Sequence, residues 1–281
     1  MCGEECKVVR FSQFIGKQQA APPDMAPAPL WKLVGAFAVV YLVWGSTYLF
    51  IRIGVADIPP AVLAGLRFVA AGVGLSLFGF ARGGKLPRGR DCLSVFVLGI
   101  GLVAIGNGTV TWSEQWLPSG EAAFITASTA LFVTLFGMFG RRADKPGLWP
   151  SIGLIIGFIG TGLMLLPRAM GHHGPAFPAL VLVGSSCVWA ATAIYLRNTG
   201  IRGTDPFVFT GLQMLVGGSI LTAIAGASGG FERVHWTASG IGAIAYLAVF
   251  GSALAYTTYN WLIEHVRPSQ MGTSGYLNPA V

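Results

Sequence analysis

Eight long apolar runs occupy most of this 281-residue chain. A helix needs about 20 apolar residues to cross the roughly 30 Å hydrocarbon core of a bilayer, and each run is about that long. The runs are continuously apolar, whereas the strands of a membrane barrel alternate apolar and polar residues, so they predict transmembrane helices. They are Leu33–Ile51, Ala61–Phe80, Cys92–Val110, Pro118–Gly140, Leu148–Leu166, Ala179–Leu196, Phe207–Ala227 and Ala238–Ile263, and a ninth begins near Pro268.

Charge is scarce, and its placement predicts an orientation. Only 10% of the residues are charged, against about 25% in a soluble domain, so the chain cannot cover a water-facing surface. The net charge is +7, and most lysines and arginines lie in the N-terminal segment and in alternate loops, such as 82–90 and 141–145. Because cytoplasmic loops are rich in Lys and Arg, this pattern predicts a multi-pass membrane protein with a cytoplasmic N-terminus, and no nucleic-acid partner.

The chain repeats itself. YLVWGSTYLFIRIG (41–54) and CVWAATAIYLRNTG (187–200) each place a Trp eight residues before an Arg, at an offset of 145. AGLRFVAAG (64–72) matches TGLQMLVGG (210–218) at an offset of 146, and PSG at 118 matches PSQ at 268. The first unit holds five helices, an odd number, so the second must enter the membrane from the opposite side. Inverted repeats of this kind are typical of secondary transporters.

Several motifs identify a family resemblance. YLVWGSTYLFIRIG, the IPP turn followed by LAGLRF, GNGTVTWSEQWLPSGEAA and FGSALAYTTYNWLIEHVRPSQ resemble the EamA-type branch of the drug/metabolite transporter superfamily, over about residues 31–281. The resemblance implies ten transmembrane helices in two inverted five-helix repeats. It also implies export or exchange of small metabolites, amino acids or drugs across a bacterial inner membrane.

The domain boundaries follow from the repeat and the resemblance. We expect a disordered N-terminal tail at 1–30, a first repeat at 31–167 and a second at 178–281. The family pattern would continue beyond Val281 with the rest of helix nine and a tenth helix, so we expect a C-terminally truncated chain, either a fragment or a truncated gene. Met25, directly before the first helix, is the expected natural start. A truncated, transport-incompetent membrane protein is therefore an alternative function.

Polar and aromatic residues inside the runs are the candidates for lining a substrate cavity. Their alternative roles are structural: hydroxyls in helices bond to carbonyls of the preceding turn, and aromatic rings near helix ends anchor the membrane interface. Ala130 stands where the family commonly has a proline, which predicts a straighter fourth helix. The cavity candidates are Trp44, Ser46, Thr47, Asn107, Thr111, Trp189, Tyr256, Tyr259, Tyr276 and Asn278.

Few ionisable residues lie within or beside the membrane, where they are costly. Arg67, about seven residues into the second run, is expected either to pair or snorkel, or to contact an anionic substrate. Glu114 and Glu121 bracket the turn after the third run. Glu121 is the candidate for either capping the fourth helix or carrying a coupling proton. Arg52 and Arg197 end their helices, where a cation suits the C-terminal carbonyls.

The predicted function is a secondary transporter that works by alternating access, and not an enzyme. A membrane-embedded enzyme, the less favoured class, would need clustered acid, base or metal-binding residues, and the runs hold no such cluster. No metal site or cofactor is expected from the four cysteines and four histidines. The expected partners are a small-molecule substrate, best a neutral or zwitterionic amphiphile, the lipid bilayer and, as one option, a second copy in a homodimer.

Overall fold

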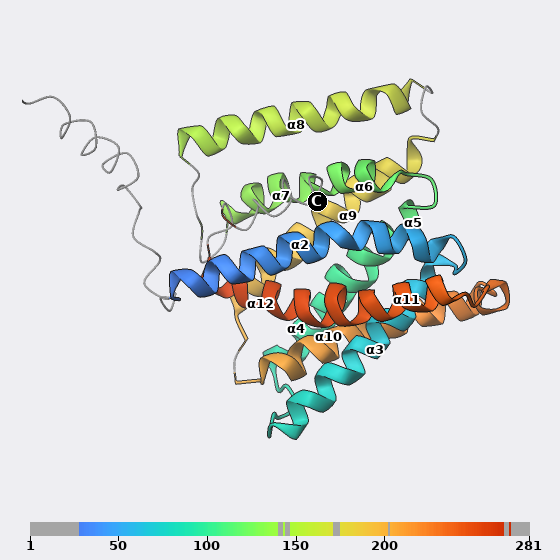
Figure 1. Ribbon diagram of the computed structural model, residues 1–281. Helices are drawn as coiled ribbons and strands as arrows, with labels where there is room; N and C mark the ends of the chain where they lie inside the picture. The colour runs from blue at the N-terminus through green and yellow to red at the C-terminus, as the bar shows by residue number, and fades with distance from the viewer. Residues whose placement is uncertain are drawn as a thin grey trace, which may run out of the picture.

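The computed structural model describes residues 28–139, 143, 147–170, 175–201, 203–266 and 270. Every regular element in these ranges is a helix, which confirms the predicted all-helical class (Figure 1). Most of the ninth run, including the candidates Tyr276 and Asn278, lies outside the described residues.

Seven helical stretches are long and apolar enough to cross a membrane. Four of them are single helices: α2 (Leu30–Val55), α3 (Pro60–Ala81), α9 (Phe177–Thr199) and α10 (Pro206–Ala227). A fifth consists of α6 (Ser119–Thr126) and α7 (Ser128–Gly137). The fifth predicted run forms α8 (Leu148–Ala169), which contains a shorter apolar stretch at Ser151–Leu163. With the two stretches described next, each of the eight complete runs contains a helix.

The remaining two stretches change helix type in the middle. The first consists of α4 (Arg90–Leu98), the π-helix η1 (Gly99–Asn107) and α5 (Gly108–Ser113). The second consists of α11 (Ala238–Tyr246), the π-helix η3 (Leu247–Leu254) and α12 (Ala255–His265). A short 3₁₀ turn, η2 (Phe231–Arg233), precedes α11. π-helical turns are rare and frequently occur at functional sites. Their presence in both stretches makes the residues around η1 and η3 candidates for a functional site.

The straighter fourth helix stays a prediction: α6 and α7 are separated only at Ala127, whose backbone keeps αR dihedral angles. The hydroxyl of Thr126 donates to the carbonyls of Ala122 and Ala123, at 3.0 and 2.9 Å. Bonds of this kind, from a hydroxyl to the preceding turn, are common where a Ser or Thr lies inside a helix.

Helices α3 and α10 form a closely packed antiparallel pair. A Cβ added at Gly72 would lie 2.8 Å from the carbonyl oxygen of Gly211, and one added at Gly79 would lie 2.9 Å from the amide nitrogen of Val208. Small residues let transmembrane helices approach in this way, and the approach is what stabilises them in lipid. Both helices begin with a proline at their first position, Pro60 and Pro206, where the missing N–H is not needed.

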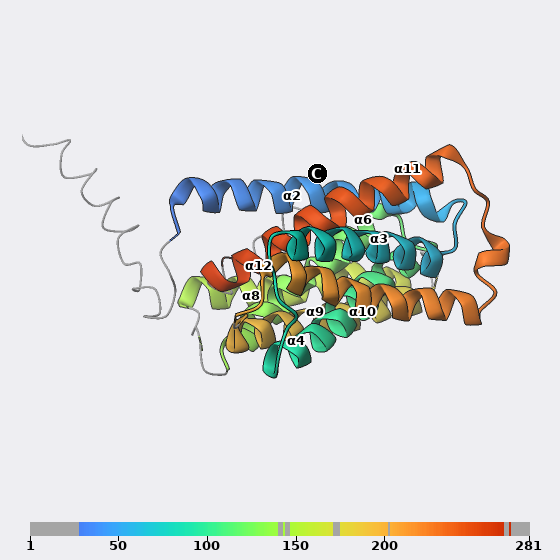
Figure 2. The same cartoon turned by 90° about the horizontal axis from the view of Figure 1, so that it is seen from below.

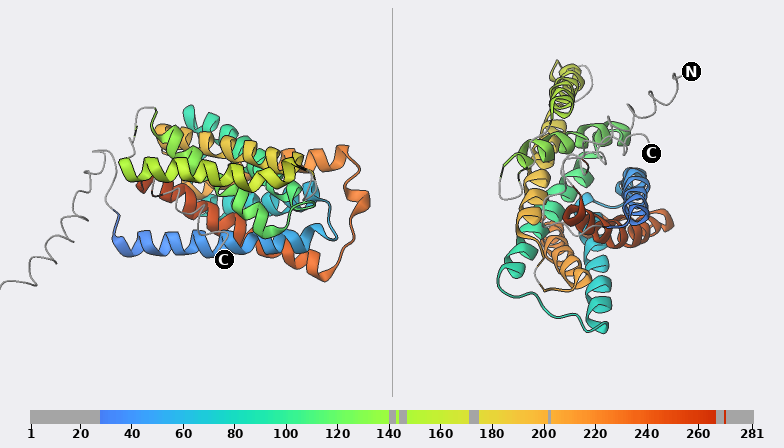
Figure 3. Two further views of the ribbon diagram at one scale, coloured as in Figure 1. Left: turned by 90° about the horizontal axis from the view of Figure 1, so that it is seen from above. Right: turned by 90° about the vertical axis from the view of Figure 1, so that its left-hand side faces the viewer.

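The helices run side by side in one bundle. Figure 2 shows α2 and α11 along one edge and α4 along the opposite edge, and the end-on view in Figure 3 shows α8 standing outside the rest, where it packs on α7. Many large apolar side chains are exposed, for example Leu42 at 62% and Leu77 at 63%. They are the surface that lipid covers. The largest buried cluster lies between α2, α3, η1, α9, α10 and α12, and the candidate site is inside it.

Candidate functional site

Four of the predicted cavity residues form an aromatic cluster at the centre of the bundle. Trp44 on α2 lies 5.6 Å from Trp189 on α9, between ring centroids, and the rings meet edge to face. Trp44 also lies 4.7 Å from Tyr259 and 5.6 Å from Tyr256, both on α12. Trp189 completes the cluster at 5.8 Å from Tyr256 and 5.9 Å from Tyr259. Edge-to-face and tilted pairs at these distances are favourable, each by about 0.5–1.5 kcal/mol.

Hydrogen bonds orient the two indoles. Nε1 of Trp189 donates to the hydroxyl of Tyr259 at 2.9 Å. Nε1 of Trp44 donates to the carbonyl of Gly251 at 3.2 Å. Gly251 lies in η3, so the π-helical segment supplies an acceptor to the cluster. The tryptophans of the two repeated stretches thus touch each other and both contact the same helix.

A buried arginine continues this cluster. Arg67 is only 2% exposed, and its Nη2 donates to Oδ1 of Asn107 at 2.8 Å. Its guanidinium lies over the ring of Phe68, 4.5 Å from the centroid. Nε of Arg67 has no hydrogen-bond partner in the described part of the chain. Arg67 therefore pairs inside the bundle and does not snorkel toward water.

Asn107 links this arginine to the aromatic residues. Its Nδ2 donates to the hydroxyl of Tyr256 and also to the carbonyl of Leu102, the latter at 3.2 Å. The Tyr256 hydroxyl donates in turn to the same carbonyl at 3.2 Å. Asn107 ends η1, and Leu102 lies within it, so a π-helical segment again offers a carbonyl for bonding. The network runs from α3 through η1 to α12.

The hydroxyl candidates mostly make local bonds. Thr47 donates to the carbonyl of Trp44 at 2.6 Å, and Thr111 donates to that of Asn107 at 2.9 Å. Such bonds to the preceding turn are the structural alternative to cavity lining that the sequence analysis gives for hydroxyl residues. Ser46 differs, because its hydroxyl bonds the carbonyl of Val43 at 2.8 Å and also meets the hydroxyl of Tyr246 on α11 at 2.7 Å.

Of the two carboxylates that bracket the turn after α5, Glu114 is the fully buried one. Glu121 lies in the first turn of α6 and is half-buried, while Glu114 is 0% exposed. Burial raises the pKa of Glu114 to about 8, an effect that the Ser119 hydroxyl and the positive charges of Arg67 and Arg52 reduce. The one sequence signal for this burial is the pair of tryptophans in WSEQW, which flank Glu114 two residues away on either side.

Gln213 is a second buried polar residue that the sequence did not single out. It stands at the position of Arg67 in the repeat and is 0% exposed. Neither its amide nitrogen nor its oxygen has a hydrogen-bond partner among the described residues. Arg52 and Arg197 lie in the last turns of α2 and α9, as predicted.

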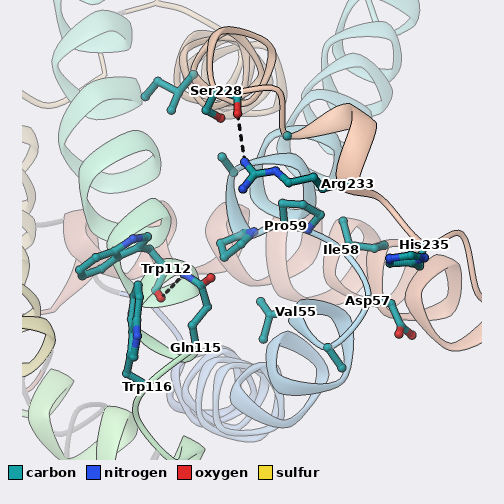
Figure 4. Close-up of a pocket in the computed structure, with 15 residues that line it drawn as sticks. Val55, Asp57, Ile58, Pro59, Trp112, Gln115, Trp116, Ser228, Arg233 and His235 are labelled. Atoms are coloured by element: carbon teal, nitrogen blue, oxygen red, sulfur yellow. Dashed lines mark hydrogen bonds between the residues drawn. The ribbon is translucent and has the colours of Figure 1, made fainter. Parts of the chain in front are cut away.

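A pocket of about 480 Å³ opens at one end of the bundle (Figure 4). None of the predicted cavity residues that the structure describes lines it. One wall is aromatic, formed by Trp112 and Trp116, whose ring centroids are 4.5 Å apart. The acidic and basic residues around it are Asp57, Arg233 and His235. Figure 4 shows Arg233 turned to the carbonyl of Ser228, to which its Nη2 donates at 3.0 Å. Among the described residues, no group of three or more His, Cys, Asp or Glu could hold a metal ion.

Comparison with known proteins places this architecture in a family. The chain matches the EamA-like transporter family over residues 31–166 and 176–281. It is 37% identical over 256 residues to YedA of Escherichia coli strain K12, described as an uncharacterized inner membrane transporter, covering 90% of this chain and 81% of that protein. It is 24% identical to the uncharacterized transporter YvbV of Bacillus subtilis strain 168, covering 92% and 83%.

Two further likenesses are more distant. A probable terminal-alkyne amino-acid exporter of Streptantibioticus cattleyicolor is 24% identical, covering 90% of this chain and 83% of that protein. A solved crystal structure shares the fold with a TM-score of 0.67 at 21% identity, covering 90% of this chain and 85% of that one. The chain therefore belongs to the EamA-like transporter family of the drug/metabolite transporter superfamily, and it is a multi-pass protein of a bacterial inner membrane.

Proposed function

We propose that the protein is a secondary transporter, and not an enzyme, in which two inverted repeats (31–167 and 178–281) enclose one substrate site and open it to each side in turn. The observation that carries this proposal is the contact between Trp44 and Trp189, which correspond to each other in the repeated stretches and meet at 5.6 Å. Inverted-repeat transporters bind substrate near the midplane, between the repeats.

The packing of α3 on α10 supports the inverted arrangement. A Cβ at Gly65 would lie 2.9 Å from the amide nitrogen of Thr222, and one at Gly211 would lie 2.7 Å from that of Ser76. A shift of 146 positions turns Gly65 into Gly211 and Ser76 into Thr222, so the two contacts exchange under the offset of the repeat. Two halves related by an axis in the membrane plane would pack in this way. The matching π-helical centres, η1 and η3, fit the same relation.

The chemistry of the site favours a neutral or zwitterionic amphiphile, such as an amino acid or a small drug. Four aromatic rings offer faces for an apolar group, and Arg67 and Asn107 offer donors for a carboxylate. Both polar residues are now bonded within the protein, so substrate would replace those bonds. The amino-acid exporter among the relatives fits this class. We propose that the protein exports or exchanges such a substrate.

Counterflow in proteoliposomes tests the proposal. Vesicles that hold the purified protein are loaded with a mixture of unlabelled amino acids, and uptake of each labelled amino acid is measured. We expect saturable uptake of a subset, lowered at least about tenfold by Trp44→Ala or Trp189→Ala, since 1.4 kcal/mol of lost binding is tenfold. Trp31→Ala is the matched control, because Trp31 lies on α2 but is 72% exposed. Uptake that is non-saturable, or equally lowered by the control, contradicts the proposal.

A further inference from the structure

The surroundings of Glu114 disfavour the charged form of its carboxyl group. It directly follows α5 and is 0% exposed. Its Oε2 accepts one hydrogen bond, from the hydroxyl of Ser119 at 3.3 Å, while Oε1 has no partner among the described residues. The carbonyl groups at a helix C-terminus present partial negative charge, which also disfavours an anion there. A neutral carboxyl is therefore the form that this site accommodates.

The charged neighbours do not neutralise it by direct pairing. Arg52 on α2 donates its Nη1 to the backbone carbonyl of Glu114 at 2.5 Å, and not to the carboxylate. Tyr48, also on α2, bonds Thr126 on α6 at 2.5 Å between hydroxyl oxygens. Arg67 on α3 acts on Glu114 only through its charge, since its bond goes to Asn107. These three are the titratable or charged groups that act on the carboxyl in the described structure, with Glu121 seven residues further along the same turn and helix.

Glu114 stands in the sequence between residues that line the pocket. Trp112, Gln115 and Trp116 line the pocket, while the Glu114 side chain does not. Gln115 is held by a bond from its Nε2 to the carbonyl of Trp112 at 3.0 Å (Figure 4). The backbone of Glu114 is bonded to Arg52 on α2, so a movement of residues 114–118 away from α2 would uncover the carboxyl next to the residues that line the pocket.

We propose that Glu114 is a proton-binding site: its carboxyl is neutral while residues 114–118 pack on α2, and it releases its proton to water in the pocket when those residues move. The proton leaves as hydronium or to a buffer base, the carboxylate remains, and the reverse transfer restores the acid. The linkage of this step to substrate movement rests on the proposed transport function, whereas the proton site itself does not.

Infrared spectroscopy tests the proton site without a substrate. Purified protein in lipid nanodiscs is titrated with base, and the C=O stretch of protonated carboxyl groups is followed. We expect one such band to persist at neutral pH and to disappear around pH 8. The band should be absent from Glu114→Gln and retained in Glu121→Gln, the matched control. A band that disappears in the range of ordinary glutamates, or that survives in Glu114→Gln, overturns the proposal.

A second variant keeps the test valid if Glu114→Gln fails to fold. Ser119→Ala removes the hydroxyl that lowers the pKa of Glu114, so the midpoint of the band should move to higher pH. An unchanged or lower midpoint contradicts the assignment to Glu114, because a merely structural role for Ser119 would not shift it upward.

Counterflow of amino acids on either side of pH 8 then tests the linkage to transport. We expect the rate of the wild type to change across this range and that of Glu114→Gln to change less. An equal rate on both sides in the wild type refutes the linkage. Absence of any counterflow in the wild type counts against the proposed function, while the infrared result still decides on the proton site.

Discussion

Replacing Gly72 by alanine should weaken the contact between α3 and α10. The added Cβ would lie 2.8 Å from the carbonyl oxygen of Gly211 and 2.9 Å from the amide nitrogen of Leu215. Both are backbone atoms of α10, so no side chain can rotate to make room, and the helices must separate locally. Overpacking of this kind costs about 1–3 kcal/mol.

Gly74 on the same helix isolates this cost. An added Cβ there would meet nothing within 4 Å, and the residue is exposed. Both replacements gain the same backbone term, roughly 0.5–1 kcal/mol for alanine over glycine within a helix. That term cancels in the difference, so Gly72→Ala should be less stable than Gly74→Ala by about 1–3 kcal/mol.

Unfolding by SDS in mixed micelles, followed by tryptophan fluorescence, measures the two free energies. Gly74→Ala should match or exceed the wild type, and Gly72→Ala should unfold at lower SDS. Equal free energies of unfolding for the two variants would refute the close approach of α3 and α10, and with it the pseudo-symmetric packing that supports the repeat.

Two further predictions concern the polar residues. Asn107→Ala removes the link between Arg67 and Tyr256 and leaves a buried arginine without its bond. It should therefore lower the free energy of unfolding by about 1–3 kcal/mol and abolish counterflow. Ser239→Ala is the control, because Ser239 is exposed and bonds to Thr237 nearby. Raising the pH from about 4.5 to about 8 should destabilise the wild type but not Glu114→Gln, because the unfolded state loses the Glu114 proton in this window while the folded state keeps it. The loss approaches roughly 5 kcal/mol above pH 8, and thermal unfolding at a series of pH values measures it.

The sequence predicts the transmembrane helices for a physical reason. Bilayer thickness fixes the length of an apolar helix, so the eight complete runs were visible without any knowledge of packing. The contact of Trp44 with Trp189 was not itself predicted, but both were named because each stands at the same place in a repeated stretch. The repeat thus pointed to a pair of residues that the fold brings together.

The choice between two carboxylates could not be made from the sequence. Glu114 and Glu121 flank the same turn, and their burial depends on how α2 and α6 close over it, which is a tertiary property. The pocket could not be predicted from the sequence either. Asp57 belongs to the connection between α2 and α3, while Arg233 and His235 follow α10. No local pattern links residues so far apart in the chain.

Gln213 gives a final prediction about conformational change. Its buried carboxamide has no partner among the described residues, whereas Arg67, its counterpart in the repeat, is bonded to Asn107. An unsatisfied buried amide costs about 1–3 kcal/mol, and no described residue offsets this cost for Gln213. A second conformation that gives Gln213 a partner would remove it. Gln213→Met keeps the volume without the amide. It should therefore raise the free energy of unfolding by up to about 1–3 kcal/mol and slow counterflow, because it favours one conformation over the other. Gln115→Met is the control for the free energy of unfolding, since Gln115 is exposed and bonded locally. A Gln213→Met variant that is less stable than the wild type, or equally active, would mean that the amide has no such role.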